Sequence, residues 1–195
     1  MGTVGAVVLA AGGSKRLGQP KQLVRIDGES LVRRAVVAAR DGGCGAIVVI
    51  AGELMSEIER ESLGTPAVVI HNADWRRGVG TSIATCVRAI AATNEELQFV
   101  MILACDQPFV SGEVVRALID AQRTSGKPIV ASTYANTIGI PALFDRSCFA
   151  ALVALSGDAG AKRIIESRRS EVAIIPFEAG AIDIDTPADL QFLTQ

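Results

Sequence analysis

Three cations lie in a short loop of small residues near the N-terminus of this 195-residue chain. Lys15, Arg16 and Lys21 follow the apolar run 4–9 and the small residues of 10–14. Small residues let backbone N–H groups approach an anion closely, and the cations add charge that N–H dipoles lack. We therefore predict that the loop binds a nucleoside triphosphate. Nucleotide contacts in the loop are expected from Leu9, Ala10, Ala11, Gly12, Gly13, Ser14, Arg16 and Lys21.

Two common phosphate-binding loops do not fit this stretch. Gly13 and Gly18 have the spacing of a Walker A loop, but Gln19 stands where that loop needs lysine. The dinucleotide fingerprint G-x-G-x-x-G is absent from the loop, which disfavours an NAD-dependent oxidoreductase. An ordinary strand-to-helix turn with solvated lysines is the alternative, and it leaves the joint presence of small residues and cations unexplained.

Two aspartates farther along the chain could hold a divalent cation. Asp106 follows the apolar run 99–103, and carboxylate oxygen is a ligand that Mg²⁺ prefers. A capping role for Asp106 is the alternative, but Ser111 is better placed to cap the next helix. Alternation predicts Asp183 and Asp185 on one face of a strand. We take Asp185 as the second metal ligand, with Asp183 in reserve.

Segment 72–82 is a second stretch of small residues, predicted to join a strand to a helix. We expect Gly80 and Ser82 to contact the nucleotide, because free N–H groups at a helix N-terminus favour anions. Simple capping of the helix by Thr81 or Ser82 is an equally good account. Asp158 is expected to cap a later helix in the same way, or to contact a second substrate. Near the C-terminus, Thr186 is expected to cap the last helix.

Apolar runs alternate with helical patterns along the whole chain. Helices are predicted over 31–39, 83–90 and 114–119. Segment 133–147 breaks the alternation and is predicted to form a lid or an insertion. The pattern indicates a single domain over 1–195 with a Rossmann-like three-layer α/β/α fold and a mostly parallel central sheet. Strands are predicted over 4–9, 46–50, 67–70, 99–103, 129–131 and 172–176.

Composition narrows the classes of protein further. The formal net charge is −2, so neither nucleic acid nor a membrane surface is an expected partner. No apolar run reaches the roughly 20 residues of a membrane span, and the N-terminus does not resemble a signal peptide. The four cysteines form no C-x-x-C pair, which disfavours a zinc site or a disulfide scaffold. A cytoplasmic location is expected.

These motifs together resemble the molybdenum cofactor cytidylyltransferase branch of the nucleotidyltransferase superfamily. The resemblance covers nearly the whole chain. It implies an enzyme that transfers a nucleotidyl group from a triphosphate to a phosphorylated acceptor and releases pyrophosphate. In that interpretation Arg16, Lys21 and Asp106 are the catalytic residues, and Asp106 and Asp185 hold Mg²⁺. The matching segments are 9–23, 72–82, 105–108, 139–144, 157–161 and 183–190.

The same resemblance informs the choice of base and acceptor. Ala10-Ala11-Gly12 is similar to the cytidine-using enzymes, whereas the guanosine-using enzymes carry Ala-Gly-Gly. CTP is therefore the expected donor and molybdopterin the expected acceptor, with a molybdoenzyme apoprotein as a further partner. Ile140 stands where the family carries histidine in a Gly-His-Pro motif. Two alternatives stay open: a guanylyl- or other nucleotidyltransferase for a different phosphorylated metabolite, and a non-catalytic cofactor-binding maturation chaperone.

Overall fold

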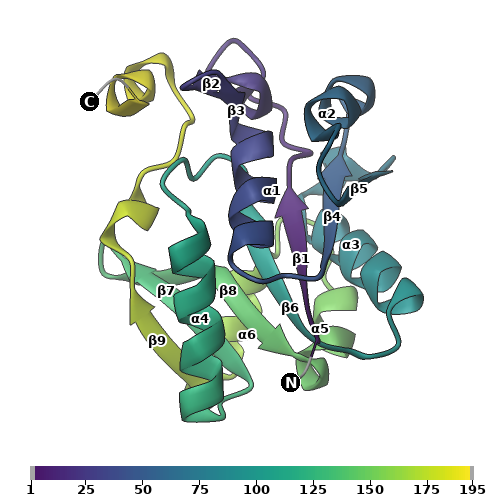
Figure 1. Cartoon of the computed structure of the whole chain (residues 1–195), viewed down its shortest axis with the longest axis vertical. Coiled ribbons are helices and arrows are strands. Elements are labelled where there is room, and N and C mark those ends of the chain that lie inside the picture. Colours follow the sequence, from purple (N-terminus) through teal and green to yellow (C-terminus); the bar gives the residue numbers. More distant parts are fainter. Residues whose placement is uncertain (1–2, 194–195) are drawn as a thin grey trace.

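The computed structural model describes residues 3–193 and contains one seven-stranded sheet with helices on both faces (Figure 1). The strand order is β5-β4-β1-β6-β8-β7-β9. A separate two-stranded antiparallel sheet pairs β2 (Arg25–Ile26) with β3 (Glu29–Ser30). The strands of the large sheet are β1 (Thr3–Leu9), β4 (Ala46–Ala51), β5 (Ala67–His71), β6 (Leu97–Ala104), β7 (Ile129–Tyr134), β8 (Thr137–Asp145) and β9 (Val172–Pro176).

The two faces of the sheet bury two separate apolar clusters. One cluster joins the sheet to α1 (Leu31–Asp41), α2 (Met55–Ser62) and α4 (Gly112–Ser125). The other joins it to α3 (Val79–Thr93), α5 (Phe149–Val153) and α6 (Ala161–Ser167), which lie behind the sheet in Figure 1. The central strands are covered on both sides, which is why their sequences are continuous apolar runs. This arrangement confirms the predicted three-layer fold.

Strand directions follow the predicted, mostly parallel pattern with one exception. β1 runs parallel to β4 and β6, β4 runs parallel to β5, and β7 runs parallel to β9. Strand β8 is antiparallel to both of its neighbours, β6 and β7.

Ser111 caps α4 as predicted, because its hydroxyl accepts a hydrogen bond from the N–H of Val114 at 3.4 Å.

The prediction of a lid over 133–147 is wrong, because most of this segment is β8. Ile138, Ala142 and Phe144 are buried between the layers. The pairing of β7 with β8 shifts register where Ala131 opposes Ala142 and Ser132 opposes Gly139. Residues 140 and 141 therefore form a bulge, and a bulge tolerates a proline inside a sheet. Gly139 and Pro141 are the residues that break the apolar pattern of this buried strand in the sequence.

Segment 183–186 is also not the strand that alternation predicts. It is an extended connection that leads into a 3₁₀ helix over Pro187–Leu193. Its contact with the sheet is a hydrogen bond from the N–H of Ile184 to the carbonyl oxygen of Asp106, at 2.9 Å. Ile184 is fully buried against Leu17 and Leu31.

Within residues 3–193, none of the helices combines the length and apolarity needed to cross a membrane.

Candidate active site

Three chain segments meet at the carboxyl ends of β1 and β6. The loop that follows β1 carries Lys15 and Arg16, and it leads to a 3₁₀ turn over Lys21–Leu23. Asp106 follows β6, the neighbour of β1 in the sheet. The hydrogen bond of Ile184 to Asp106 brings the 183–185 segment to the same edge. Ligands of open α/β sheets bind at this edge, so the predicted location of the site agrees with the fold.

The four charged residues selected from the sequence form one connected cluster. The ammonium group of Lys21 donates hydrogen bonds to Oδ2 of Asp106 and to Oδ1 of Asp185, the latter at 2.9 Å. The guanidinium of Arg16 donates to the other carboxylate oxygen of Asp185 at 2.6 Å. The Lys21 side chain is 14% exposed and that of Arg16 is 71% exposed. Lys21 is therefore the inner cation of the site and Arg16 the outer one.

The electrostatics of the cluster fix the charge on its central residue. Burial alone would lower the pKa of Lys21, but Asp106 and Asp185 outweigh that effect and raise the pKa above its usual value. Lys21 is consequently a cation at any physiological pH. Burial, reinforced by the negative charges of Asp106 and Asp185, raises the pKa of Asp183 to about 6. Among the described residues Asp183 has no ion-pair partner, whereas Asp185 pairs with both Lys21 and Arg16.

Asp189 holds the backbone beside Asp185. Its carboxylate accepts hydrogen bonds from the N–H groups of Asp185 and Thr186, at 3.0 and 2.7 Å, and from the Thr186 hydroxyl at 2.9 Å. These bonds lower the pKa of Asp189 below its usual value. The Thr186 hydroxyl therefore donates to Asp189, in the first turn of the 3₁₀ helix, instead of accepting from a helix N–H group as a cap would. The arrangement orients Asp185 toward Lys21.

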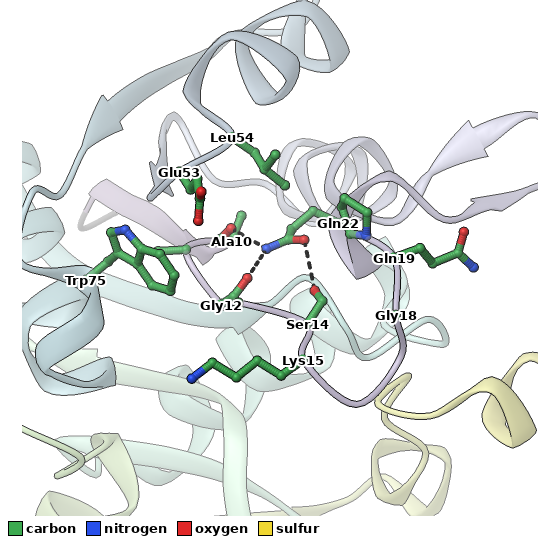
Figure 2. Close-up of a pocket in the computed structure, with 13 residues that line it drawn as sticks. Ala10, Gly12, Ser14, Lys15, Gly18, Gln19, Gln22, Glu53, Leu54 and Trp75 are labelled. Carbon is green, nitrogen blue, oxygen red and sulfur yellow. Dashed lines mark hydrogen bonds between the residues drawn. The ribbon is translucent and has the colours of Figure 1, made fainter.

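Gln22 is a site residue that sequence reasoning missed. Its side chain is buried, and its amide nitrogen donates to the carbonyl oxygens of Ala10 at 2.8 Å and Gly12 at 2.6 Å (Figure 2). The Ser14 hydroxyl donates to the amide oxygen of Gln22 at 3.3 Å and accepts from the N–H of Lys21 at 2.9 Å. Gln22 therefore fixes the backbone of the loop from inside.

A cavity of about 330 Å³ opens beside this loop. Figure 2 shows Trp75 and Gln22 on opposite sides of it, with Glu53 and Leu54 projecting from the loop after β4. A second cavity of about 650 Å³ shares Gly12, Gly13 and Trp75 with the first and extends to Lys21 and Asp106. The two cavities together offer room for a flat ring beside the loop and for charged groups at the aspartates.

Trp75 is the other residue that the sequence did not single out. A Cβ atom on Gly52 would lie 2.8 Å from the indole of Trp75, and one on Gly13 would lie 3.2 Å from it. The two glycines therefore make room for the indole between the loop after β1 and the loop after β4. The guanidinium of Arg76 stacks on the indole 4.6 Å from its centroid. A useful signal in the sequence is that Trp75 is the single tryptophan of the chain.

The hydroxyls of segment 72–82 do not cap α3. The helix begins after Gly78, which has a φ of +111°, so Thr81 and Ser82 lie inside its first turn. The amide nitrogen of Asn72 instead donates to the hydroxyl oxygens of Thr81 and Ser82, at 2.9 and 3.0 Å. Ser82 lines the 650 Å³ cavity, together with Lys21 and Asp106.

Gly80 is placed differently from Ser82. Its N–H donates to the carbonyl oxygen of Gly157 at 2.9 Å, and the residue is not among those lining the two cavities. The expected N–H contact of Gly80 with an anion is therefore already taken by the chain itself. The capping prediction for Asp158 is wrong, because α6 begins after Gly160 and has no side-chain cap.

A loop of small residues, one inner and one outer cation, and two carboxylates meet at the carboxyl edge of this α/β sheet, which is typical of the nucleotidyltransferase class. The sequence comparison agrees with this site. The chain belongs to the family of the MobA-like NTP transferase domain, whose pattern matches residues 6–172. The family predicted from the motifs is thereby confirmed.

Relatives cover the chain to different extents. Nicotine blue oxidoreductase of Paenarthrobacter nicotinovorans is 29% identical over 194 residues, which cover 94% of this chain and 92% of that protein. The bifunctional IPC transferase and DIPP synthase of Rubrobacter xylanophilus is 43% identical over 91 residues, 44% of this chain. This match spans 21% of the length of the bifunctional protein.

Among solved structures, Rv0371c of Mycobacterium tuberculosis superposes with a TM-score of 0.79 at 28% identity. The match covers 98% of this chain and 96% of that one. The same mycobacterial protein in complex with manganese gives a TM-score of 0.76 at 26% identity, with 98% and 97% coverage. The fold and its length are therefore shared with these proteins almost from end to end.

Proposed function

We propose that this protein transfers CMP from CTP to a phosphorylated acceptor, releases pyrophosphate, and depends on Mg²⁺. The observation that carries the proposal is the convergence of Lys21, Asp106 and Asp185 beside the small-residue loop. Molybdopterin is the proposed acceptor, because the motifs resemble molybdenum cofactor cytidylyltransferases. A cytoplasmic location and a molybdoenzyme partner belong to the same proposal.

The proposed reaction needs no nucleophile from the protein. An ionised phosphate oxygen of the acceptor attacks the α-phosphorus of CTP, forming a new P–O bond. The bond from the α-phosphorus to the bridging oxygen breaks, and pyrophosphate leaves with its electron pair. Negative charge grows on the leaving group, and Lys21 and Arg16 would stabilise it. The roles of Arg16, Lys21 and Asp106 in catalysis rest on this chemistry.

The two aspartates fit a magnesium ion. Their carboxylates converge on one cation, the Lys21 ammonium, which shows that both can face a common positive charge. Residues 3–193 contain no group of three or more metal-ligating side chains, so substrate phosphates would complete the coordination. Asp106 and Asp185 would hold the ion, and it would neutralise charge on the phosphates.

The 330 Å³ cavity is the proposed site of the cytosine ring. Glu53 lines it, and a carboxylate accepts hydrogen bonds well from the exocyclic amine of cytosine. Uracil carries an oxygen at that position, which a carboxylate repels. Ala11 and Trp75 narrow the same cavity and favour a pyrimidine over a purine.

Replacing Glu53 should therefore change the choice between CTP and UTP. We expect Glu53→Gln to reduce the preference for CTP over UTP by about 10-fold, because an amide can donate to the uracil oxygen. Fluorescence of the single tryptophan, Trp75, measures both dissociation constants directly. Glu59→Gln removes the same charge from an exposed position of α2 and should leave the preference unchanged. An unaltered CTP preference in Glu53→Gln would refute the assignment.

The whole proposal is tested by incubating the protein with Mg²⁺, molybdopterin and each nucleoside triphosphate in turn. We expect pyrophosphate release with CTP and at least about 10-fold less with GTP, ATP or UTP. Preferred release with GTP would replace the cytidylyl assignment with a guanylyl one. Tight binding of molybdopterin without any pyrophosphate release would favour a maturation chaperone. Oxidation of NADH or NADPH without pyrophosphate would favour an oxidoreductase.

A further inference from the structure

Lys21 bridges the two carboxylates proposed as metal ligands. Its ammonium group contacts one oxygen of Asp106 and one oxygen of Asp185. The side chains of Lys21 and Asp106 are largely shielded from water, and that of Asp185 is 34% exposed. The two aspartates come from segments 79 residues apart, so the lysine is what joins them electrostatically. The Lys21 ammonium is the cation that contacts both carboxylates, while the Arg16 guanidinium contacts Asp185 alone.

A divalent cation that binds both Asp106 and Asp185 would occupy the space between them that the Lys21 ammonium fills. Two cations within a few ångströms of each other repel strongly in a partly buried site. Lys21 must therefore withdraw from at least one carboxylate before such an ion can bind to both. In the absence of another partner, that withdrawal leaves the Lys21 ammonium without a counter-charge.

The surroundings of Lys21 allow its side chain to turn while its backbone stays fixed. Its N–H is held by the Ser14 hydroxyl at 2.9 Å, and the adjoining Gln22 is anchored to the loop. The side chain lines both the 650 Å³ cavity and a smaller cavity that reaches Arg16. Phosphates in either cavity would offer the ammonium a new anionic partner.

We propose that Lys21 is an exchangeable counter-ion that blocks the metal site until a nucleotide draws it away, so that metal and nucleotide bind together. This inference rests on the proposed function, since it concerns the metal and the triphosphate of that reaction. It predicts that removing the Lys21 charge improves metal binding by the free protein much more than removing a neighbouring charge that does not occupy the metal site.

The test is a titration of the nucleotide-free protein with Mn²⁺, followed by electron paramagnetic resonance of the free ion. We expect Lys21→Met to bind Mn²⁺ about 10- to 100-fold tighter than the wild type. Arg16→Met is the matched control, because Arg16 also neutralises Asp185 but contacts only that carboxylate and is exposed. Its affinity for Mn²⁺ should stay within about threefold of the wild type.

Two results would overturn the proposal. If Lys21→Met binds Mn²⁺ no tighter than the wild type, then Lys21 does not block the site. If Arg16→Met gains as much as Lys21→Met, the effect is one of net charge rather than position. Neither result depends on catalysis, so failure of the proposed CMP transfer would be seen separately in the pyrophosphate assay.

The wild-type protein offers a second measurement, which holds even if Lys21→Met does not fold. Acetylation of lysine amines, read by mass spectrometry, reports how accessible each ammonium group is. Saturating Mn²⁺ without nucleotide should raise the labelling of Lys21 severalfold while that of Lys15 stays constant. Unchanged labelling of Lys21, in protein shown to have bound Mn²⁺ at Asp106, would contradict displacement.

Discussion

Asp106→Asn should lower the rate of CMP transfer by about 1000-fold or more. The substitution keeps the shape of the side chain but removes the negative charge that would hold Mg²⁺ at the end of β6. A 1000-fold loss corresponds to about 4 kcal/mol of transition-state stabilisation, which is within reach of one metal-ion interaction. Steady-state release of pyrophosphate from CTP measures the effect.

The same variant should keep its fold. Lys21 retains its hydrogen bond to Asp185 at 2.9 Å, and the carbonyl oxygen of residue 106 still accepts from Ile184. We therefore expect the melting temperature to stay within about 4 °C of the wild type. A large fall in melting temperature would make Asp106 a structural residue, and its loss of activity would then say nothing of metal binding.

Asp183→Asn is the matched control for Asp106→Asn. Asp183 lies two residues from Asp185, the residue is exposed, and among residues 3–193 it forms no ion pair. Its loss should reduce the rate by less than about 10-fold. If Asp183→Asn proves as damaging as Asp106→Asn while Asp185→Asn is mild, then Asp183 is the second metal ligand instead of Asp185.

The sequence predicts those parts of the molecule in which neighbours along the chain decide the outcome. Apolar runs that continue for a whole strand locate β1, β4 and β6, and Ser111 is recognised as a cap because its partner is three residues away. Asp106 could be selected because it follows a strand directly. In parallel sheets that position alone places a side chain at the ligand-binding edge.

The sequence is less informative where the partner of a residue is remote. Nothing near Lys21 indicates that it pairs with carboxylates 85 and 164 positions away. Gln22 hydrogen-bonds to backbone carbonyl groups of the loop. Every residue has such a group, so the residue types of the loop do not indicate which side chain will bind there. The sequence did not predict strand β8, because glycine and proline usually argue against a buried strand. The bulge in β8 is what accommodates them.

The packing of segment 72–82 against segment 156–160 is another contact between residues far apart in the sequence, which the sequence does not predict. Gly78 adopts a φ of +111°, a backbone conformation that residues other than glycine rarely adopt. A Cβ atom there would lie 2.3 Å from the carbonyl carbon and oxygen of Gly157. Backbone atoms cannot rotate away as a flexible side chain can, so the two segments would have to separate.

Gly78→Ala should consequently destabilise the protein by about 3 kcal/mol or more, through backbone strain and steric overlap together. For a chain of this size that lowers the melting temperature by roughly 6–12 °C. Calorimetry or circular dichroism measures the shift without any assumption about activity.

Gly43→Ala separates the two causes. Gly43 has a similar φ of +102°, but a Cβ atom on it would meet nothing within 4 Å. This variant carries the backbone strain alone and should lose only about 1 kcal/mol, or roughly 2–4 °C. If the two variants melt at the same temperature, then the contact with Gly157 does not constrain segment 72–82. A larger loss in Gly78→Ala would instead establish that the start of α3, where Ser82 lines the 650 Å³ cavity, is held in place by segment 156–160.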